Sequence, residues 1–141
     1  TKGRFVYGGG GIMPDIFVPI DTIGFSKYLG KLSKKAIVYR YSFVYADAHR
    51  EEFAKFKDYK SILKHLKSKN LLNDLVKYAA KNGIKKDIKG LRISKEIIET
   101  RLYAYIARHF IDDEGFYPII AELDNTLHKA SKILEDNIEL K

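Results

Sequence analysis

The chain has 141 residues, of which 45% are apolar and 31% charged, a balance that favours one globular domain over a disordered chain. It has no cysteine, which excludes disulfides, thiolate nucleophiles and cysteine zinc sites, and no apolar run approaches the about 20 residues of a membrane span. The formal net charge of +8 is unevenly spread, because residues 25–95 hold nineteen Lys or Arg against six acids and residues 96–141 hold five against ten.

Residues 3–20 are predicted to be extended, with strands around Arg4 to Tyr7 and Asp15 to Val18 joined by the glycine run Gly8 to Gly11. A phosphate-binding loop needs Lys-Ser or Lys-Thr after its glycines and a helix that opens there. Ile12 to Asp15 follow the glycines instead, and then a second strand. The glycine run therefore predicts a tight hairpin turn, in which side chains would clash, and not a nucleotide site.

Helix formers dominate after Thr22, and the apolar spacing predicts a mainly α fold: a bundle of about five helices preceded by a short N-terminal β-hairpin or extended segment. The expected helices are Lys34 to Phe56, Tyr59 to Lys67, Leu71 to Lys81, Ser94 to Ile111 and Tyr117 to Asn137. The first is ambiguous, because its aromatic residues alternate with a period of two, as in a strand, while apolar residues also recur at helical spacing. The two sets are Tyr39, Tyr41, Phe43 and Tyr45, and Ile37, Tyr41, Val44 and Ala48.

Three signals mark the ends of these helices. Asn82-Gly83 is typical of a left-handed C-terminal cap, Ser94 of an N-cap, and Asp112 to Gly115 of a turn. The last helix carries an apolar seam, which we expect to pack against the Ser94 helix. The seam consists of Ile120, Leu123, Leu127, Ala130 and Leu134.

The residue types that could carry chemistry form no recognisable constellation. The histidines contain no His-Glu-x-x-His pair, and His109 continues an apolar helix face, as a hydrogen-bonded core or boundary residue does. Ser61 and Lys64 are one helical turn apart, but they lie on a lysine-rich helix that we expect to be exposed. We therefore predict no catalytic, cofactor-binding or metal-binding residue in this chain. The four histidines are His49, His65, His109 and His128.

The glycine motif and its neighbours resemble a known family. Gly3-Arg4, Tyr7 to Ile12, Pro14 to Ile16 and Val18 are similar to the close of the catalytic domain in tail-specific (carboxy-terminal processing) serine peptidases. The resemblance is to the long forms, found in Bacteroidetes, that carry a helical C-terminal extension. Later elements agree with it, namely Tyr45-Ala46, Ile106 to Arg108, Gly115 to Tyr117 and the terminal helix.

The resemblance implies an exported parent endopeptidase, in the periplasm or cell envelope, that cuts proteins near their C-termini with a Ser-Lys dyad. Its PDZ domain would capture the substrate tail, and its dyad would lie before Thr1, so this chain alone is expected to be inactive. Residues 1–21 would be the end of the catalytic core, and residues 22–141 a non-catalytic accessory domain for scaffolding, substrate gating or self-association. The expected partners are the rest of the peptidase and, through it, protein substrates, with no cofactor.

The charge supports an alternative function, a stand-alone basic helical module that binds nucleic acid or another anionic surface. The cations of residues 25–95 are spread over several predicted helices rather than gathered in one arm. We therefore expect no sequence-specific binding of nucleic acid.

Overall fold

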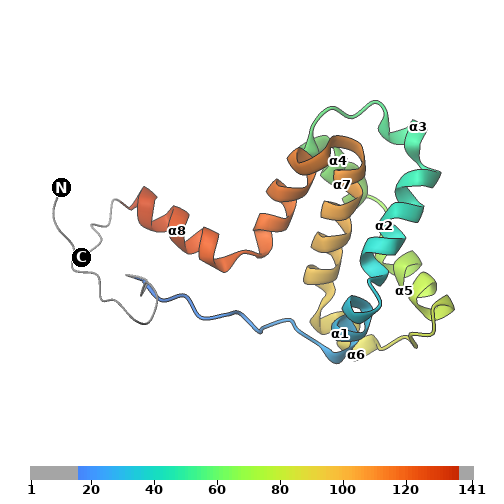
Figure 1. Cartoon of the computed structure of the whole chain (residues 1–141), viewed down its shortest axis with the longest axis horizontal. Helices are drawn as coiled ribbons and strands as arrows, with labels where there is room; N and C mark the ends of the chain where they lie inside the picture. Colours follow the sequence, from blue (N-terminus) through green and yellow to red (C-terminus); the bar gives the residue numbers. More distant parts are fainter. Residues whose placement is uncertain (1–15, 137–141) are drawn as a thin grey trace, which may run out of the picture. The chain divides into compact units, whose positions relative to one another are not determined.

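The computed structural model describes residues 16–136, and these contain eight α-helices, one 3-10 helix and no strand (Figure 1). The predicted mainly α class is confirmed. The first strand and the glycine turn of the predicted hairpin lie outside the described residues, and residues 16–21 form neither helix nor strand. The helices are α1 (Lys27–Lys34), α2 (Ile37–Ala48), α3 (Arg50–Phe53), α4 (Tyr59–Lys67), α5 (Leu71–Lys81), α6 (Ile88–Ile93), α7 (Lys95–Ile120), η1 (Ala121–Leu123) and α8 (Asn125–Glu135).

The chain forms two compact units. Residues 22–124 form the larger unit, which contains α1 to α7 and η1. The smaller unit contains the described segments 16–21 and 125–136, where the Asn125 amide donates a hydrogen bond to the Asp21 carboxylate (2.6 Å) at the start of α8. The predicted boundary between residues 21 and 22 concerns a larger protein and stays a prediction.

The core of the larger unit is built around α7. This helix packs against α2, α4 and α5, and α1 packs against both α2 and α6. Its buried face repeats every three or four residues and is completed by aliphatic and aromatic side chains from every neighbouring helix. The most completely buried large side chains are Tyr28, Leu29, Leu32, Ile37, Phe53, Ile62, Leu66, Leu75, Ile98, Leu102, Ile106 and Ile119.

Two helices have the predicted bounds, and local capping explains both. The Asp58 carboxylate accepts a hydrogen bond from the Ser61 N–H (2.9 Å) and so begins α4. Helix α5 ends before Gly83, whose φ of +78° is the left-handed conformation that glycine adopts at low cost. Ser94 begins α7 as predicted, but its hydroxyl makes no capping bond, because it donates to the Gly24 carbonyl (2.6 Å) in the segment before α1.

The predicted single helix over residues 34–56 is wrong. Lys34 ends α1, Ala36 adopts a left-handed φ of +50°, and α2 begins at Ile37. At about 100° per residue, Tyr28 and Ile37 would point to opposite sides of one continuous helix, yet both are buried. The break at Ala36 therefore turns both apolar faces toward the same core, and a second break at His49 separates α3.

The C-terminal half departs from the prediction in two ways. The turn expected at residues 112–115 is tighter, since only Ile111 and Asp112 leave helical geometry before α7 resumes. The last helix is shorter than predicted, because the extended backbone of Asp124 separates α7 and η1 from α8. Within α8, which belongs to the smaller unit, Leu127 is 47% exposed and Leu134 is 75% exposed. The predicted packing of the seam against the Ser94 helix stays a prediction.

Candidate binding cleft

An aromatic surface lies along α2 and the straight first part of α7. Helix α2 carries aromatic residues on two opposite sides, so one pair must face outward when the other enters the core. Tyr41 and Tyr45 are buried, whereas Tyr39 and Phe43 are 51% and 55% exposed. The period-two run of aromatics that suggested a strand is therefore a helix with one buried and one exposed aromatic face. The helical stripe predicted from Ile37, Tyr41, Val44 and Ala48 is only partly buried, because the Val44 side chain is exposed.

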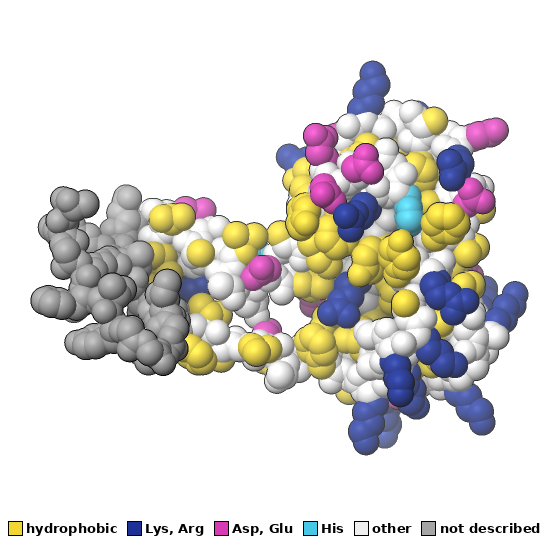
Figure 2. All heavy atoms as spheres, in the orientation of Figure 1, with side chains coloured by type: hydrophobic (Ala, Val, Ile, Leu, Met, Phe, Trp, Pro, Cys, Tyr) yellow, Lys and Arg dark blue, Asp and Glu magenta, His cyan; other side chains and the backbone are white. Residues whose placement is uncertain are grey.

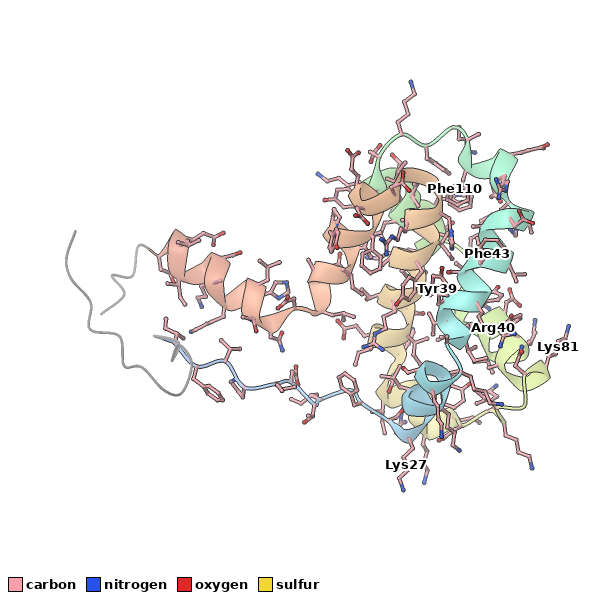
Figure 3. The ribbon with its side chains drawn as sticks, viewed as in Figure 1. Lys27, Tyr39, Arg40, Phe43, Lys81 and Phe110 are labelled. Carbon is pink, nitrogen blue, oxygen red and sulfur yellow. The ribbon has the colours of Figure 1, made fainter. Side chains whose placement is uncertain are left out.

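A cleft of about 240 Å³ opens between these two helices (Figure 3). The Phe43 ring meets His109 edge to face, with ring centroids 5.5 Å apart, and Phe110 stacks on the buried Phe53 at 4.4 Å. Beside the cleft, Tyr39 contacts Tyr105 edge to face at 5.4 Å. The cleft is lined by Phe43, Ala46, Asp47, Arg50, His109 and Phe110. Its walls are therefore mixed: two aromatic rings and Ala46 stand beside the polar side chains of Asp47, Arg50 and His109.

His109 is exposed at the edge of the cleft and makes one long polar contact. Its Nε2 lies 3.4 Å from the Ser42 Oγ, and the Ser42 hydroxyl donates its own proton to the Tyr39 carbonyl (2.7 Å). Because that proton is already donated, the Ser42 oxygen is free to accept from the His109 ring at this long distance. Partial burial, followed by the charges of Arg108 and Arg50, lowers the pKa of His109 below its ordinary value.

The charges at the rim of the cleft are already paired. The Arg50 Nε donates to the Asp47 carboxylate at 3.0 Å. Arg108 lies 3.0 Å from Asp113 across the α7 bend, and its guanidinium also covers the Phe116 ring at 5.0 Å. A partner residue that enters the cleft therefore meets aromatic rings, the His109 imidazole and charges that are already paired.

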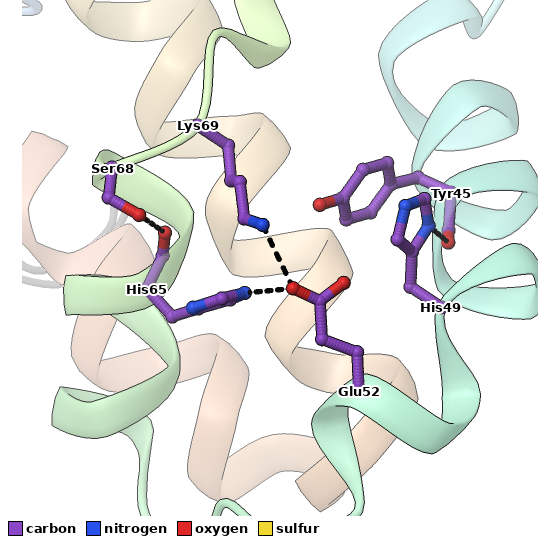
Figure 4. Close-up of polar contacts among 6 residues, drawn as sticks. All are labelled: Tyr45, His49, Glu52, His65, Ser68 and Lys69. Carbon is purple, nitrogen blue, oxygen red and sulfur yellow. Dashed lines mark hydrogen bonds and ion pairs between the residues drawn. The ribbon is translucent and has the colours of Figure 1, made fainter.

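A second polar cluster joins α3 to α4 (Figure 4). The Glu52 carboxylate accepts hydrogen bonds from Lys69 Nζ (2.9 Å) and His65 Nε2 (2.7 Å), and these bonds, Lys69 first, lower the pKa of Glu52. His49 stacks on Tyr45 with ring centroids 4.0 Å apart, and burial raises the pKa of the Tyr45 phenol to about 12. The Glu52 carboxylate thus ties α3 to α4 and to Lys69 just beyond it.

In the part of the chain that the structure describes, Ser61, Lys64 and His128 do not form a catalytic group. The Ser61 hydroxyl donates to the Asp58 Oδ2 (2.7 Å), and Lys64 is exposed to solvent. His128 lies on α8 in the smaller unit, beside Phe17 and Lys132. Within residues 16–136, no three His, Asp or Glu side chains are close enough to hold a metal ion, and no helix is long and apolar enough to cross a membrane.

Sequence reasoning missed the cleft, although its main signal was visible. Aromatic residues at Tyr39 and Phe43 are four apart, which places them on the same side of a helix whose opposite side is also aromatic. The sequence also predicted that His109 is a core or boundary residue. In the structure this residue is exposed at the rim of the cleft, where it makes one long hydrogen bond.

The fold and the cleft define a helical domain with an exposed aromatic groove. The chain belongs to a family of unknown function, DUF8443, whose model matches residues 28–112. The matched region begins at the first buried residue of α1 and ends at the non-helical residue Asp112 in α7. It therefore contains both walls of the cleft. No curated protein and no solved structure matches the chain with significance.

Proposed function

We propose that this chain is a non-catalytic helical accessory domain of a tail-specific serine endopeptidase and that it binds protein at the α2–α7 cleft. The link to the peptidase is supported by the sequence from Gly3 to Val18, which resembles the end of that catalytic domain. The parent would be exported to the periplasm or cell envelope and would cut proteins near their C-termini.

One observation carries the binding role: two aromatic side chains of α2, one lining the cleft and one beside it, are about half exposed. Phe43 and Tyr39 are not among the buried core residues, and each makes a ring contact with α7. Rigid aromatic side chains on a protein surface lose little conformational entropy when a partner covers them, and they dominate many protein interfaces. We expect the bound partner to be a protein segment with an apolar side chain, from the catalytic core or from a substrate.

The first test is the gene sequence that precedes the Thr1 codon. The proposal expects a PDZ-like segment and a Ser…Lys pair there. An upstream sequence that encodes neither would contradict the peptidase assignment, whatever the cleft binds.

The second test uses the whole protein that the gene encodes and a protein substrate with an unstructured C-terminal tail. Phe43→Ala is expected to raise KM about tenfold, since loss of a central interface aromatic costs at least about 1 kcal/mol, and to leave kcat unchanged. Val44→Ala is the matched control, because Val44 is similarly exposed on α2 but does not line the cleft. Equal kinetics for the two variants would contradict binding at the cleft.

A further inference from the structure

The end of the larger unit formed by α1 and α6 has an unusual surface. Residues 22–35 and 81–96 meet there, because α1 packs on α6 and the Ser26 N–H donates to the Ser94 hydroxyl (3.0 Å). These two segments together hold ten Lys or Arg against two acids. Figure 2 shows Lys and Arg side chains gathered over this end, where Lys27 projects into solvent in Figure 3.

The cations of α1 form a single stripe. Lys27, Lys31 and Lys34 recur at helical spacing on the side opposite the buried Leu29 and Leu32. Within the described part of the chain, only Lys95 among the ten cations has an ion-pair partner, Glu99 at 3.9 Å. Residues 16–136 thus give the other nine cations no ion-pair partner at salt-bridge distance.

The outward face of α6 combines cations with apolar side chains. Gly90 packs its backbone against Tyr28, where an added Cβ would lie 2.7 Å from the Tyr28 Cβ. With that side fixed inward, Ile88, Lys89, Arg92 and Ile93 face outward, and the two isoleucines are 71% and 57% exposed. Two large aliphatic side chains thus stand in water among lysines.

We propose that this α1–α6 face binds the surface of an anionic lipid bilayer. The lysines would contact lipid headgroups, and Ile88 and Ile93 would enter the boundary between headgroups and acyl chains. The cations of α1 and α6 match the negative charge of such a surface, and the exposed aliphatic residues distinguish it from nucleic acid. These cations are Lys27, Lys31, Lys34, Lys89 and Arg92. Single-stranded nucleic acids are bound by aromatic stacking, and double-stranded ones by contacts to phosphates and base edges. The inference is independent of the proposed peptidase function, because it rests only on α1 and α6.

The test is co-sedimentation of the whole chain with vesicles of phosphatidylglycerol and phosphatidylcholine, compared with vesicles of phosphatidylcholine alone. Binding is expected only to the anionic vesicles and is expected to weaken as salt is added. The triple variant Lys27→Gln, Lys31→Gln, Lys34→Gln should lower the partition coefficient about 100-fold, from about fivefold per lysine.

Two further variants separate the possible causes. The double variant Ile88→Gln, Ile93→Gln keeps every charge and should still lower vesicle binding at least about tenfold. The matched control Lys55→Gln, Lys57→Gln, Lys60→Gln removes the same charge from exposed positions in the α3–α4 region and should change binding less than about threefold.

The proposal is overturned if the chain does not bind anionic vesicles, or if the control variant loses as much binding as the α1 variant. It is also overturned if the isoleucine variant binds as well as the original chain, since a purely electrostatic surface would then be sufficient. An oligonucleotide that binds more tightly than the vesicles and is unaffected by the isoleucine changes would assign the surface to nucleic acid instead.

Discussion

Gly115 determines how closely α7 can fold back on itself. A Cβ at this position would lie 2.7 Å from the Ala107 carbonyl oxygen, which belongs to the rigid backbone of the same helix before its bend. We predict that Gly115→Ala destabilises the protein by about 1–3 kcal/mol, the usual cost of overpacking a tight contact. Chemical denaturation monitored by circular dichroism would measure the loss.

Gly30 provides the matched control for that experiment. It lies within α1, is exposed, and has no atom within 4 Å of an added Cβ. Gly30→Ala should therefore stabilise the protein by about 0.4–1 kcal/mol, because alanine has the higher helix propensity. A loss of stability from Gly30→Ala, or none from Gly115→Ala, would contradict the backbone geometry described for the two glycines.

His109 should make stability depend on pH. Its pKa is lower in the folded protein than in the unfolded chain, so the unfolded state binds the proton more readily. Stability contributed by His109 is thus fully present above its unfolded pKa of about 6.5 and is lost as the pH falls toward the folded value.

We predict that the original chain loses more stability between about pH 7.5 and 5 than His109→Gln does, because only the former gains this proton on unfolding. The measurement is the urea midpoint of both proteins across that range. Parallel pH profiles would show that burial and the charges of Arg50 and Arg108 do not act on His109 as described.

At the scale of elements, the bounds of a helix are predicted best where its own sequence holds an N-terminal cap, an apolar stripe and a C-terminal cap. Helix α4 has Asp58 as its cap, and α5 ends at Asn82-Gly83, so local signals alone set both ranges. Helices α1 and α6 were missed although Ser26 and Asp87 accept capping hydrogen bonds at their starts, because both helices are short. Such short helices depend on tertiary packing for stability.

The breaks around α2 could not be read from local pattern. The left-handed Ala36 has an unfavourable conformation for a residue with a side chain, and only the shared core of α1 and α2 accounts for it. The cleft was missed for a related reason. Which aromatic face of α2 enters the core depends on α7, and a single sequence does not show that pairing.

The apolar seam of α8 gives the element-scale prediction. Leu127 lies on an amphipathic stripe but is 47% exposed, whereas Leu102 of α7 is fully buried. We predict that Leu102→Ala lowers the free energy of unfolding by about 2–5 kcal/mol, and that Leu127→Ala lowers it by about 1 kcal/mol or less. Denaturant titration of both variants decides it. A loss of several kcal/mol from Leu127→Ala would mean that the seam is buried after all, as its spacing first suggested.

At the scale of the whole molecule, the charged side chains of the larger unit are unevenly distributed. The α1–α6 end holds the excess of cations, whereas the bend of α7 and the segment after it carry Asp112, Asp113, Glu114, Glu122 and Asp124. The aromatic cleft lies on α2 and α7 and is neutral at its rim. Charge and aromatic surface therefore belong to different parts of the unit, which allows two partners of different chemistry to bind separately.

The chain alone is not expected to hydrolyse protein. A Ser-Lys dyad needs a serine hydroxyl directed at a lysine amine in a site closed to water, and Ser61 and Lys64 do not meet that requirement. The Ser61 hydroxyl donates to Asp58 at 2.7 Å, where it belongs to the cap of α4, and Lys64 is exposed. We predict no time-dependent cleavage of casein or of a substrate with an unstructured C-terminal tail. The preparation must be free of contaminating protease, so Ser61→Ala is assayed beside it. Cleavage by the original chain that disappears in Ser61→Ala would place a catalytic serine in α4 and would contradict the accessory role.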